Sequence, residues 1–392
     1  MKEIILKKGK EESLGRRHPW VFSGAIARTP SEIEEGEWVE VHSHDGRILG
    51  RGHYQIGSIT VRLLTFGEEP FTESLYEERL LNALNLRKAL GLIREDNDSF
   101  RLVHGEGDFL PGLVVDIYGD TAVMQAHSPG MHRERNLIAD ALVALPDAKI
   151  RNVYYKSETT LPFMARLDPQ NGYLIGRYDG NIALENGLQF NIDWLKGQKT
   201  GFFLDQRDNR KLLEHYARDR EVLNMFCYTG GFSVYALRGG AKRVVSVDSS
   251  SKAIALTEAN VALNFPHNTN HEAVATDAFK FLDGIGEGEY DLIVLDPPAF
   301  AKHKSALRNG LIGYRRLNAK AFERIKKGGI LFTFSCSQVV SREAFRLAVF
   351  SAAVQSGRRV RILHQLTQPA DHPVDIAHPE GEYLKGLVLY VE

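Results

Sequence analysis

The spacing of hydrophobic positions divides the chain into three regions. Up to residue 68, short alternating runs at 38–42, 48–54 and 59–64 are separated by glycine-containing turns. Alternation of apolar and polar residues is typical of half-buried strands, so this region predicts a small, barrel-like β domain. The leucines of 72–90 fall roughly on one side of a helix, which predicts an amphipathic helix after the barrel.

Between residues 100 and 178, short strand-like runs surround one helical segment at 130–145. This arrangement predicts a second domain of the α+β class. A hairpin is expected next, at 181–194, because Asn186 and Gly187 form a strong short-range turn signal. The expected domains are therefore 1–68, 69–178 and 179–392.

From residue 208 onward, helical and strand-like segments alternate. The expected helices are 208–217, 232–238, 250–264, 314–325 and 341–356, and the expected strands are 221–226, 243–248, 290–296 and 329–334. Such alternation predicts a doubly wound, mostly parallel sheet of the α/β class, which is a Rossmann-like fold. Sheets of this kind bind ligands beyond the carboxyl ends of their strands.

Composition places the chain among folded globular proteins, with 43% hydrophobic and 25% charged residues. No apolar run approaches the roughly 20 residues that span a bilayer, and the charged start lacks the apolar core of a signal peptide. We therefore expect a cytoplasmic protein without a membrane partner. Because Cys227 and Cys336 are the only cysteines, a disulfide framework and a cysteine-only zinc site are excluded.

The net charge of -1 argues mildly against a nucleic-acid partner, but the charges are unevenly distributed. Nine Lys or Arg residues and one acidic residue, Glu323, lie between Lys302 and Lys327. This basic segment fits a phosphate-binding surface. It fits the solvated face of a helix equally well, so the sequence leaves both interpretations open.

A glycine turn follows the first strand of the α/β region. Gly230 and Gly231 allow a sharp bend next to a ligand, but the Gly-x-Gly-x-x-Gly pattern of dinucleotide sites is incomplete, which disfavours a nicotinamide dehydrogenase. Asp248 ends the next strand, 18 positions after Gly230, and is a candidate acceptor for the ribose diol of an adenosine. The alternative is an N-cap role ahead of the serines that follow.

Two further side chains are candidates for the same ligand. Asp277, at the end of the following strand, is a candidate partner of the adenine amino group, with a turn or cap role as the alternative. In the loop 197–207, Arg207 or Lys199 is a candidate partner for the carboxylate of a methionine moiety. An Arg–Asp network that merely anchors the following helix is an equal alternative.

The strand at 290–296 runs into Asp296, Pro297, Pro298 and, two positions later, Phe300. The prolines hold the backbone extended without N–H donors, so carbonyl groups and the Asp296 carboxylate can hold a planar base on which Phe300 stacks. A simple turn out of the strand is the alternative. Cys336, between two serines at the end of the next strand, is the candidate nucleophile, although buried cysteine is usually just a small hydrophobic residue.

Together, these motifs closely resemble the bacterial large-subunit ribosomal RNA cytosine methyltransferase family. The matching segments are 200–207, 224–230, 247–248, 295–298 and 335–337, with 17–25 near the N-terminus and 382–386 near the C-terminus. The resemblance implies a class I methyltransferase domain that binds S-adenosyl-L-methionine and an N-terminal PUA domain that binds RNA. It also implies that Asn224, Phe226 and Tyr228 lie at the cofactor, while Arg16 and Arg17 are expected to contact phosphates.

Membership of this family would imply formation of 5-methylcytosine in 23S ribosomal RNA. Addition of the Cys336 thiolate at carbon 6 would activate carbon 5, and Asp296 would stabilise charge at the N3 and amino edge of the base. The chain departs from related RNA cytosine methyltransferases, because it lacks a cysteine beside Asp-Pro-Pro and has Phe334 where some members show another. The alternatives are a base-amine methyltransferase acting on guanine or adenine and a non-catalytic RNA-binding assembly factor.

We expect no metal site. The spacing of His372, Asp375 and His378 is only weakly typical of metal ligands, and the implied reaction needs no metal. Cys227 is expected to pack near the cofactor. The sequence leaves open which nucleotide is modified, which group removes the carbon 5 proton, and whether the chain forms a homodimer.

Overall fold

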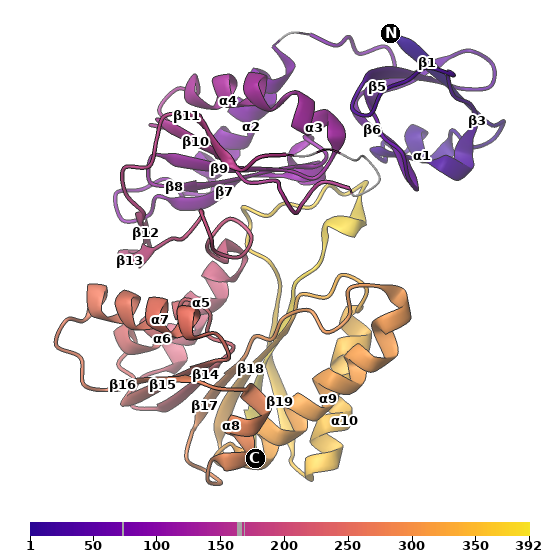
Figure 1. The fold of residues 1–392 in the computed structure, drawn as a ribbon. Coiled ribbons are helices and arrows are strands. Elements are labelled where there is room, and N and C mark those ends of the chain that lie inside the picture. Colours follow the sequence, from indigo (N-terminus) through magenta and orange to yellow (C-terminus); the bar gives the residue numbers. More distant parts are fainter. Residues whose placement is uncertain (73, 163–166, 168) are drawn as a thin grey trace. The chain divides into compact units, whose positions relative to one another are not determined.

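A computed structural model describes residues 1–72, 74–162, 167 and 169–392 of the chain (Figure 1). These residues form two compact units, and each is described by itself. Unit 1 contains Met1–Gly187, Ile192–Leu204 and Ala370–Gly381, and unit 2 contains Leu188–Asn191, Asp205–Pro369 and Glu382–Glu392. Each unit therefore combines segments that are far apart in the sequence.

The N-terminal part of unit 1 is a six-stranded, barrel-like sheet with the strand order β2-β6-β5-β4-β1-β3 (Figure 1). The elements are β1 (Lys2–Leu6), α1 (Glu12–Gly15), β2 (Trp20–Phe22), η1 (Ser23–Ala25), β3 (Ile26–Arg28), β4 (Trp38–His42), β5 (Ile48–Tyr54) and β6 (Ile59–Phe66). Alternate residues such as Val39 and Val41 point inward and form the core with Ile4 and Val61. The predicted β-rich N-terminal domain is confirmed.

The second part of unit 1 is a five-stranded sheet with the order β11-β10-β9-β8-β7. Its elements are α2 (Leu75–Ala89), β7 (Ser99–His104), η2 (Gly105–Asp108), β8 (Leu113–Tyr118), β9 (Thr121–Ala126), α3 (Pro129–Arg133), α4 (Arg135–Val143), β10 (Asn152–Tyr155) and β11 (Gly172–Ile175). The single helix expected at 130–145 is interrupted at Glu134, which ends α3. Part of the helix expected at 72–90 falls on residue 73, which lies outside the described residues.

The expected turn near residue 186 is present. Asn186 and Gly187 have φ values of 51° and 79°, a left-handed pair that suits a tight two-residue turn. The strands on either side of the turn are β12 (Ile182–Glu185) and β13 (Leu188–Asn191).

Unit 2 contains a seven-stranded sheet with the order β16-β15-β14-β17-β18-β20-β19. Its strands are β14 (Glu221–Met225), β15 (Arg243–Asp248), β16 (His271–Ala275), β17 (Leu292–Leu295), β18 (Gly329–Ser335), β19 (Val360–Leu366) and β20 (Lys385–Val391). The first five run parallel, and β20 is antiparallel to both β18 and β19. The chain builds outward from β14 in one direction and then returns to β17, so the topological switch point lies between β14 and β17.

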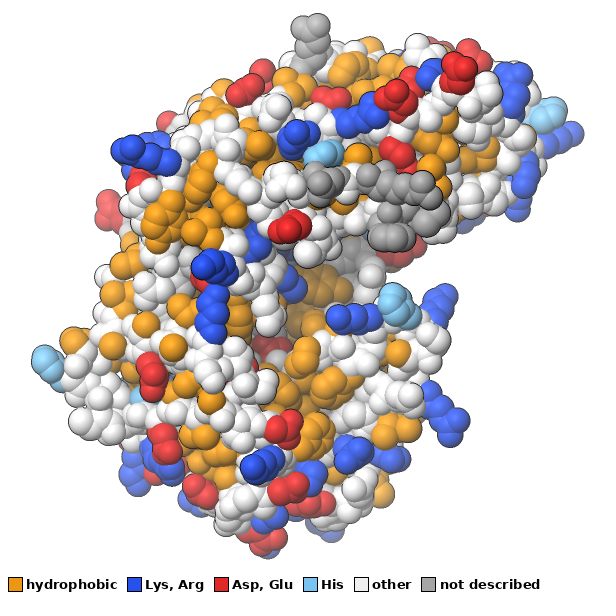
Figure 2. All heavy atoms as spheres, viewed as in Figure 1, with side chains coloured by type: hydrophobic (Ala, Val, Ile, Leu, Met, Phe, Trp, Pro, Cys, Tyr) orange, Lys and Arg blue, Asp and Glu red, His pale blue; other side chains and the backbone are white. Residues whose placement is uncertain are grey.

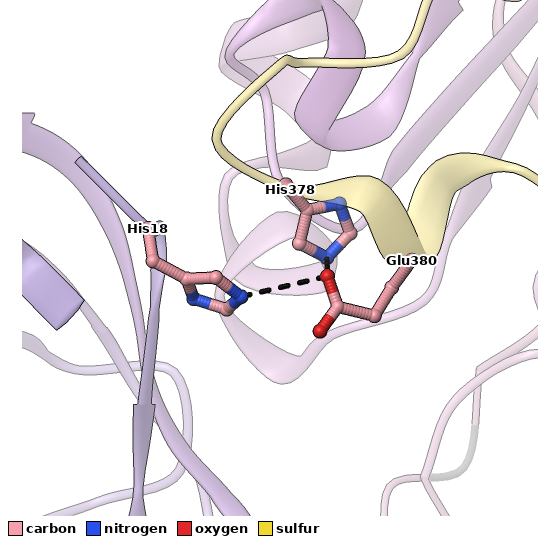
Figure 3. A group of neighbouring side chains, drawn as sticks. All are labelled: His18, His378 and Glu380. Atoms are coloured by element: carbon pink, nitrogen blue, oxygen red, sulfur yellow. Dashed lines mark ion pairs between the residues drawn. The ribbon is translucent and has the colours of Figure 1, made fainter. Parts of the chain in front are cut away.

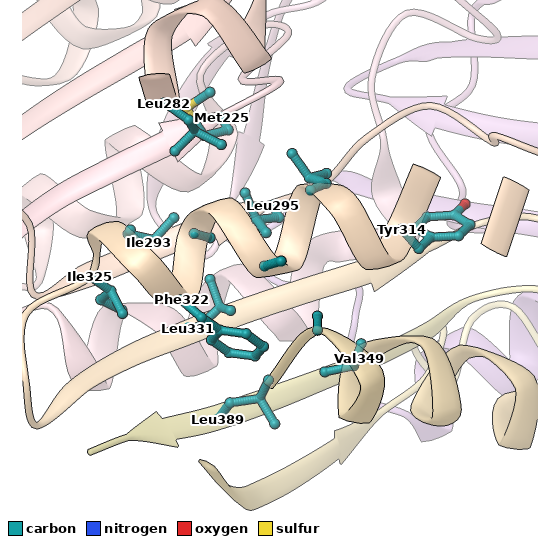
Figure 4. Close-up of a cluster of buried hydrophobic side chains, with 14 of the residues drawn as sticks. Met225, Leu282, Ile293, Leu295, Tyr314, Phe322, Ile325, Leu331, Val349 and Leu389 are labelled. Carbon is teal, nitrogen blue, oxygen red and sulfur yellow. The ribbon is translucent and has the colours of Figure 1, made fainter. Parts of the chain in front are cut away.

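Helices cover both faces of this sheet. They are α5 (Arg207–Tyr216), α6 (Gly231–Arg238), α7 (Ser251–Asn264), α8 (Ala278–Gly284), α9 (Leu307–Arg324) and α10 (Arg342–Ser356), with the short turn η5 (Lys304–Ala306). The turn η6 (Pro379–Gly381) belongs to unit 1, and η4 (Leu204–Gln206) spans the sequence boundary between the units. In Figure 1, α5, α6 and α7 lie on one face and α8, α9 and α10 on the other. Phe322 of α9, Leu331 of β18 and Leu389 of β20 belong to the core of the second face (Figure 4). The predicted doubly wound α/β fold is confirmed.

Candidate active site

A strained turn follows β14 at the carboxyl edge of the sheet. Phe226, Tyr228 and Gly230 have φ values of 59°, 48° and 78°. Left-handed conformations at non-glycine residues cost about 1–3 kcal/mol and persist only when the surroundings enforce them. Gly230 is required for space as well, because a Cβ atom there would lie 2.6 Å from Cγ2 of Thr257. The turn therefore brings its own backbone groups and the first residues of α6 to the topological switch point.

Asp248 ends β15 beside this turn. Its Oδ2 accepts a hydrogen bond from the backbone N–H of Tyr228 at 3.0 Å, and its Oδ1 accepts one from Ser250 at 2.9 Å. The N-cap of α7 is Ser250, whose hydroxyl accepts from the N–H of Ala253 at 3.3 Å. Asp248 is thus not the helix cap. Each carboxylate oxygen has a second lone pair, which can accept a hydrogen bond from a ribose hydroxyl group.

Asn224 lies beneath the turn and is 1% exposed. Its Nδ2 donates to Oγ of Ser233 at 2.8 Å, while its Oδ1 has no hydrogen-bond partner. Cys227 is also buried, and burial raises the pKa of its thiol to about 12, so this cysteine stays protonated. Asn224 thus contacts α6, and Cys227 contacts Thr257 of α7. A cofactor contact by Asn224 stays a prediction.

Asp277 and Arg207 have structural roles that match the alternatives left open by the sequence. Asp277 is exposed and caps α8, with Oδ1 accepting from the N–H of Lys280 at 2.9 Å. Arg207 is the first residue of α5, is 2% exposed, and has its Nε 3.6 Å from Oδ1 of Asp208. A cofactor contact by either side chain stays a prediction.

Asp296 follows β17, on the other side of the switch point. Nε2 of Gln206 donates to Oδ1 of Asp296 at 3.0 Å, and Oε1 of Gln206 accepts from Nδ2 of Asn209 at 2.6 Å. Gln206 and Asn209 are both buried. This relay fixes the orientation of the Asp296 carboxylate. This contact of Gln206 was not predicted, although the residue lies in the matching segment 200–207.

The Asp-Pro-Pro segment leads from β17 toward α9. Pro297 is buried and Pro298 is exposed. The ring of Phe300 packs on Tyr314, with centroids 4.7 Å apart. A stacking role of Phe300 toward a base stays a prediction, because one side of its ring already contacts α9.

Cys336 follows β18, the strand next to β17, and is half-buried. The pairing of Leu295 with Thr333 places the ends of these two parallel strands side by side. Oγ of Ser337 accepts from the N–H of Ala301 at 3.3 Å and lies 2.9 Å from the hydroxyl of Tyr314. These contacts join the segment after Asp296 to the turn that contains Cys336, so both candidate catalytic residues lie at one edge of the sheet.

Lys385 lies beside the turn that contains Cys336, a position that the sequence pattern did not predict. It faces Ser335 across the β18–β20 pairing and is 7% exposed. Its ammonium group donates to the carbonyl oxygens of Ser337 at 2.6 Å and Val340 at 2.7 Å. Burial lowers its pKa to about 8, and a thiolate at Cys336 would act in the opposite direction. The lysine in the matching segment 382–386 was the available signal.

Basic side chains follow the Asp-Pro-Pro segment on α9. Lys320 forms an ion pair with Asp283, whereas Arg308 and Arg315 are exposed. In unit 1, Arg16 forms an ion pair with Glu12 and Arg17 lies 5.9 Å from the ring centroid of Phe66. Figure 2 shows basic and acidic side chains interspersed over the visible face. The phosphate contacts expected of these arginines stay predictions.

Comparisons with known proteins agree with this geometry. Residues 160–380 match the family described as S-adenosylmethionine-dependent methyltransferase, and residues 4–66 match the PUA-like domain. Ribosomal RNA large subunit methyltransferase I of Tolumonas auensis is 41% identical to the chain over 393 residues and covers 98% of each protein. The protein of that name from Klebsiella pneumoniae is 39% identical over 394 residues, covering 99% of this chain and 98% of that protein.

Solved structures share the fold over the whole chain. A crystal structure of a methyltransferase complexed with SAH has a TM-score of 0.84 at 23% identity, and covers 100% of both chains. A structure from Streptococcus mutans, described as SAM-dependent, has a TM-score of 0.83 at 22% identity with the same coverage. Neither these comparisons nor the described residues support a homodimer. Among the described helices, none combines the length and hydropathy needed to cross a membrane.

Proposed function

Since this chain belongs to the ribosomal RNA large subunit methyltransferase I family of S-adenosylmethionine-dependent methyltransferases, we propose that it methylates carbon 5 of a cytosine in 23S ribosomal RNA. The relatives are named for large-subunit ribosomal RNA, and the PUA-like domain at residues 4–66 supports an RNA partner. We also infer that the protein acts in the cytoplasm, where that RNA is made.

One observation carries the choice of carbon 5. Asp296 and the half-buried Cys336 follow the ends of two adjacent parallel strands. A hydrogen bond from Ala301 to Ser337 joins the segments that follow these two residues in the sequence. An amine methyltransferase needs a base-holding carboxylate but no sulfur nucleophile. Carbon 5 of cytosine is a poor nucleophile and does need one.

The residues of the cofactor pocket fit S-adenosyl-L-methionine. The carboxylate of Asp248 stands at a strand end with acceptor capacity left for a ribose diol. The left-handed turn at Phe226, Tyr228 and Gly230 brings backbone close to that carboxylate. When bound there, the cofactor supplies the methyl group that carbon 5 receives.

In the proposed mechanism, the Cys336 sulfur bonds to carbon 6 of the cytosine, which makes carbon 5 nucleophilic. Asp296, oriented by Gln206, faces the N3 and amino edge and stabilises the charge that develops there. After carbon 5 has gained its methyl group, a base or a water molecule takes its proton, the electron pair of that C–H bond reforms the ring double bond, and the carbon–sulfur bond breaks. The thiolate of Cys336 is thereby restored.

The two cysteines provide a matched test of this mechanism. We expect Cys336→Ala to lower methyl transfer to ribosomal RNA at least about a hundredfold, because the covalent route is removed. Cys227→Ala removes a buried sulfur that is held protonated, and should change the rate little. Transfer of labelled methyl groups to RNA from cells without the gene measures both.

Nearly full activity in Cys336→Ala would exclude the adduct. The second candidate, methylation of an exocyclic amine, would then be preferred, and the nature of the methylated base would be read from the digested RNA.

A further inference from the structure

Unit 1 contains a cavity of about 230 Å³. It is lined by Trp20 and Arg62 of the barrel, Glu106 of η2, His127 directly after β9, and His378 of the C-terminal segment; we call it the Trp20 pocket. The volume is several times the roughly 30 Å³ of one water molecule. Sites that enclose a drug-sized ligand have larger volumes, of about 300–1,000 Å³. The size suits one small planar group.

Two side chains on the wall of this pocket carry buried polar atoms without hydrogen-bond partners. They are Nε and Nη1 of Arg62 and both ring nitrogens of His378, which is 3% exposed. An unpaired buried donor or acceptor is energetically costly, so such atoms are rare unless something else satisfies them. Burial lowers the pKa of His378, which favours the neutral ring with one donor and one acceptor.

The remaining wall identifies the kind of ligand. Nε1 of Trp20 donates to Oε1 of Glu106 at 2.7 Å, and the guanidinium of Arg62 lies 5.4 Å from the Trp20 ring centroid. A free phosphate would meet the negative charge of Glu106. A nucleobase has no charge, stacks on an indole, and can use both the arginine and the carboxylate.

Among the RNA bases, guanine matches this pair of groups best. Its O6 and N7 atoms are adjacent acceptors for two N–H groups of one arginine. Its N1–H and amino group are donors, which suit the second oxygen of Glu106. We propose that the Trp20 pocket binds one unstacked guanine of the RNA substrate.

This proposal rests on the proposed function only in taking RNA as the substrate. The surface beside the pocket supports it, because Phe22 is 43% exposed and its ring lies 6.2 Å from that of Trp20. An exposed ring next to Trp20 fits the continuation of a single strand.

A metal ion fits this place less well. His18, His378 and Glu380 point toward one another (Figure 3), with Nε2 of each histidine 3.5 and 3.7 Å from the carboxylate. The backbone N–H of Trp20, however, donates to Nδ1 of His18 at 3.2 Å. Because Nδ1 accepts this bond, the ring carries a proton on Nε2, the atom that would have to bind the metal.

The trio of metal ligands weighed from sequence spacing, His372, Asp375 and His378, is not brought together as a ligand group among the described residues. Nδ1 of His372 lies instead 3.1 Å from Oδ1 of Asp371.

The test compares single-stranded oligouridylates that carry one central guanosine or one central adenosine, bound to the full chain and measured by fluorescence anisotropy. We expect the guanosine oligomer to bind about tenfold more tightly, as a bidentate arginine contact discriminates bases by that order. Arg62→Met and Glu106→Gln should each remove most of this preference. Arg47→Met is the matched control, since Arg47 is an exposed barrel arginine paired with Asp45.

Equal affinity of the wild-type chain for both oligomers overturns the proposal, and so does a preference that survives both variants. If Arg62→Met fails to fold, the isosteric Glu106→Gln decides. Methyl transfer to ribosomal RNA is measured on the same preparations. Absence of a base preference with intact 5-methylcytosine formation rejects the pocket alone, and a guanosine preference without methyl transfer rejects the proposed function alone.

Discussion

A buried ammonium group occupies the strand beside the candidate nucleophile. Lys385 gives two hydrogen bonds to carbonyl oxygens of the turn that follows Cys336, and no described carboxylate forms an ion pair with it. A lone buried cation is costly, and a nearby thiolate would offset that cost. We therefore assign Lys385 a positioning role, in which it holds the turn and favours the ionised form of Cys336.

This role predicts the pH dependence of a reaction that needs no RNA. The rate at which iodoacetamide alkylates Cys336 should reach its half-maximum about one pH unit or more higher in Lys385→Met than in the wild-type chain. Lys385→Arg, which keeps the charge, should restore most of the wild-type profile. Mass spectrometry of the Cys336 peptide measures the rate, and buried Cys227 serves as the internal control.

An unchanged alkylation profile in Lys385→Met, in a variant that melts at the wild-type temperature, would leave Lys385 with a purely structural role. The wild-type ammonium is itself expected to lose its proton as the pH rises through about 8, because burial lowers its pKa to that value.

At the scale of elements, the turn between β14 and α6 is the most constrained segment of the cofactor site. Gly230→Ala introduces a Cβ 2.6 Å from Cγ2 of Thr257 at a φ of 78°. Thr257 donates to the carbonyl of Tyr228, so moving it disturbs the turn. We expect calorimetry to show S-adenosyl-L-methionine binding weakened about tenfold, which corresponds to strain of about 1–2 kcal/mol.

Gly284→Ala is the control for that variant, since a Cβ atom at Gly284 meets nothing within 4 Å. If both alanine variants bind the cofactor equally well, the turn does not form part of the cofactor site.

The sequence predicted elements well where periodicity and turn chemistry are local. The strand at 243–248 is observed as β15, and the Asn186–Gly187 turn has the expected left-handed pair. The predicted start of α9 was wrong, because the helix begins at Leu307 rather than near residue 314. Leu307 and Leu311 are partly buried against the core, which makes the basic segment helical from its first turn.

Other features depend on contacts between distant segments and could not be derived from local pattern. The strands β19 and β20 were not predicted, because exposed charged residues such as Arg361 hide the alternation of β19. The same holds for the site. Strand ends placed Asp248, Asp296 and Cys336 at one edge, whereas the bond from Gln206 to Asp296 exists only in the folded unit.

At the scale of the whole molecule, the basic residues of α9 are expected to bind RNA through phosphate charges. The segment after Asp296 leads from the carboxyl end of β17 into α9. The exposed residues Arg308 and Arg315 of α9 therefore follow Asp296 in the sequence. Replacing both by Gln should reduce the slope of log affinity against log salt by about 0.7–0.9 for each RNA phosphate that the variant no longer neutralises.

The control is the double variant Arg218→Gln and Lys242→Gln. These exposed residues precede β14 and β15 and therefore lie near the opposite, amino-terminal edge of the sheet. An equal reduction of salt dependence in the two double variants would show that net charge, rather than the position of α9, determines RNA binding.

The most direct measurement is a map of 5-methylcytosine in ribosomal RNA from cells lacking the gene and from cells carrying the wild-type or the Cys336→Ala gene. The account predicts that one site in 23S ribosomal RNA is unmethylated without the gene, is restored by the wild-type gene and is not restored by Cys336→Ala. Persistence of every site without the gene, or full restoration by Cys336→Ala, would contradict it.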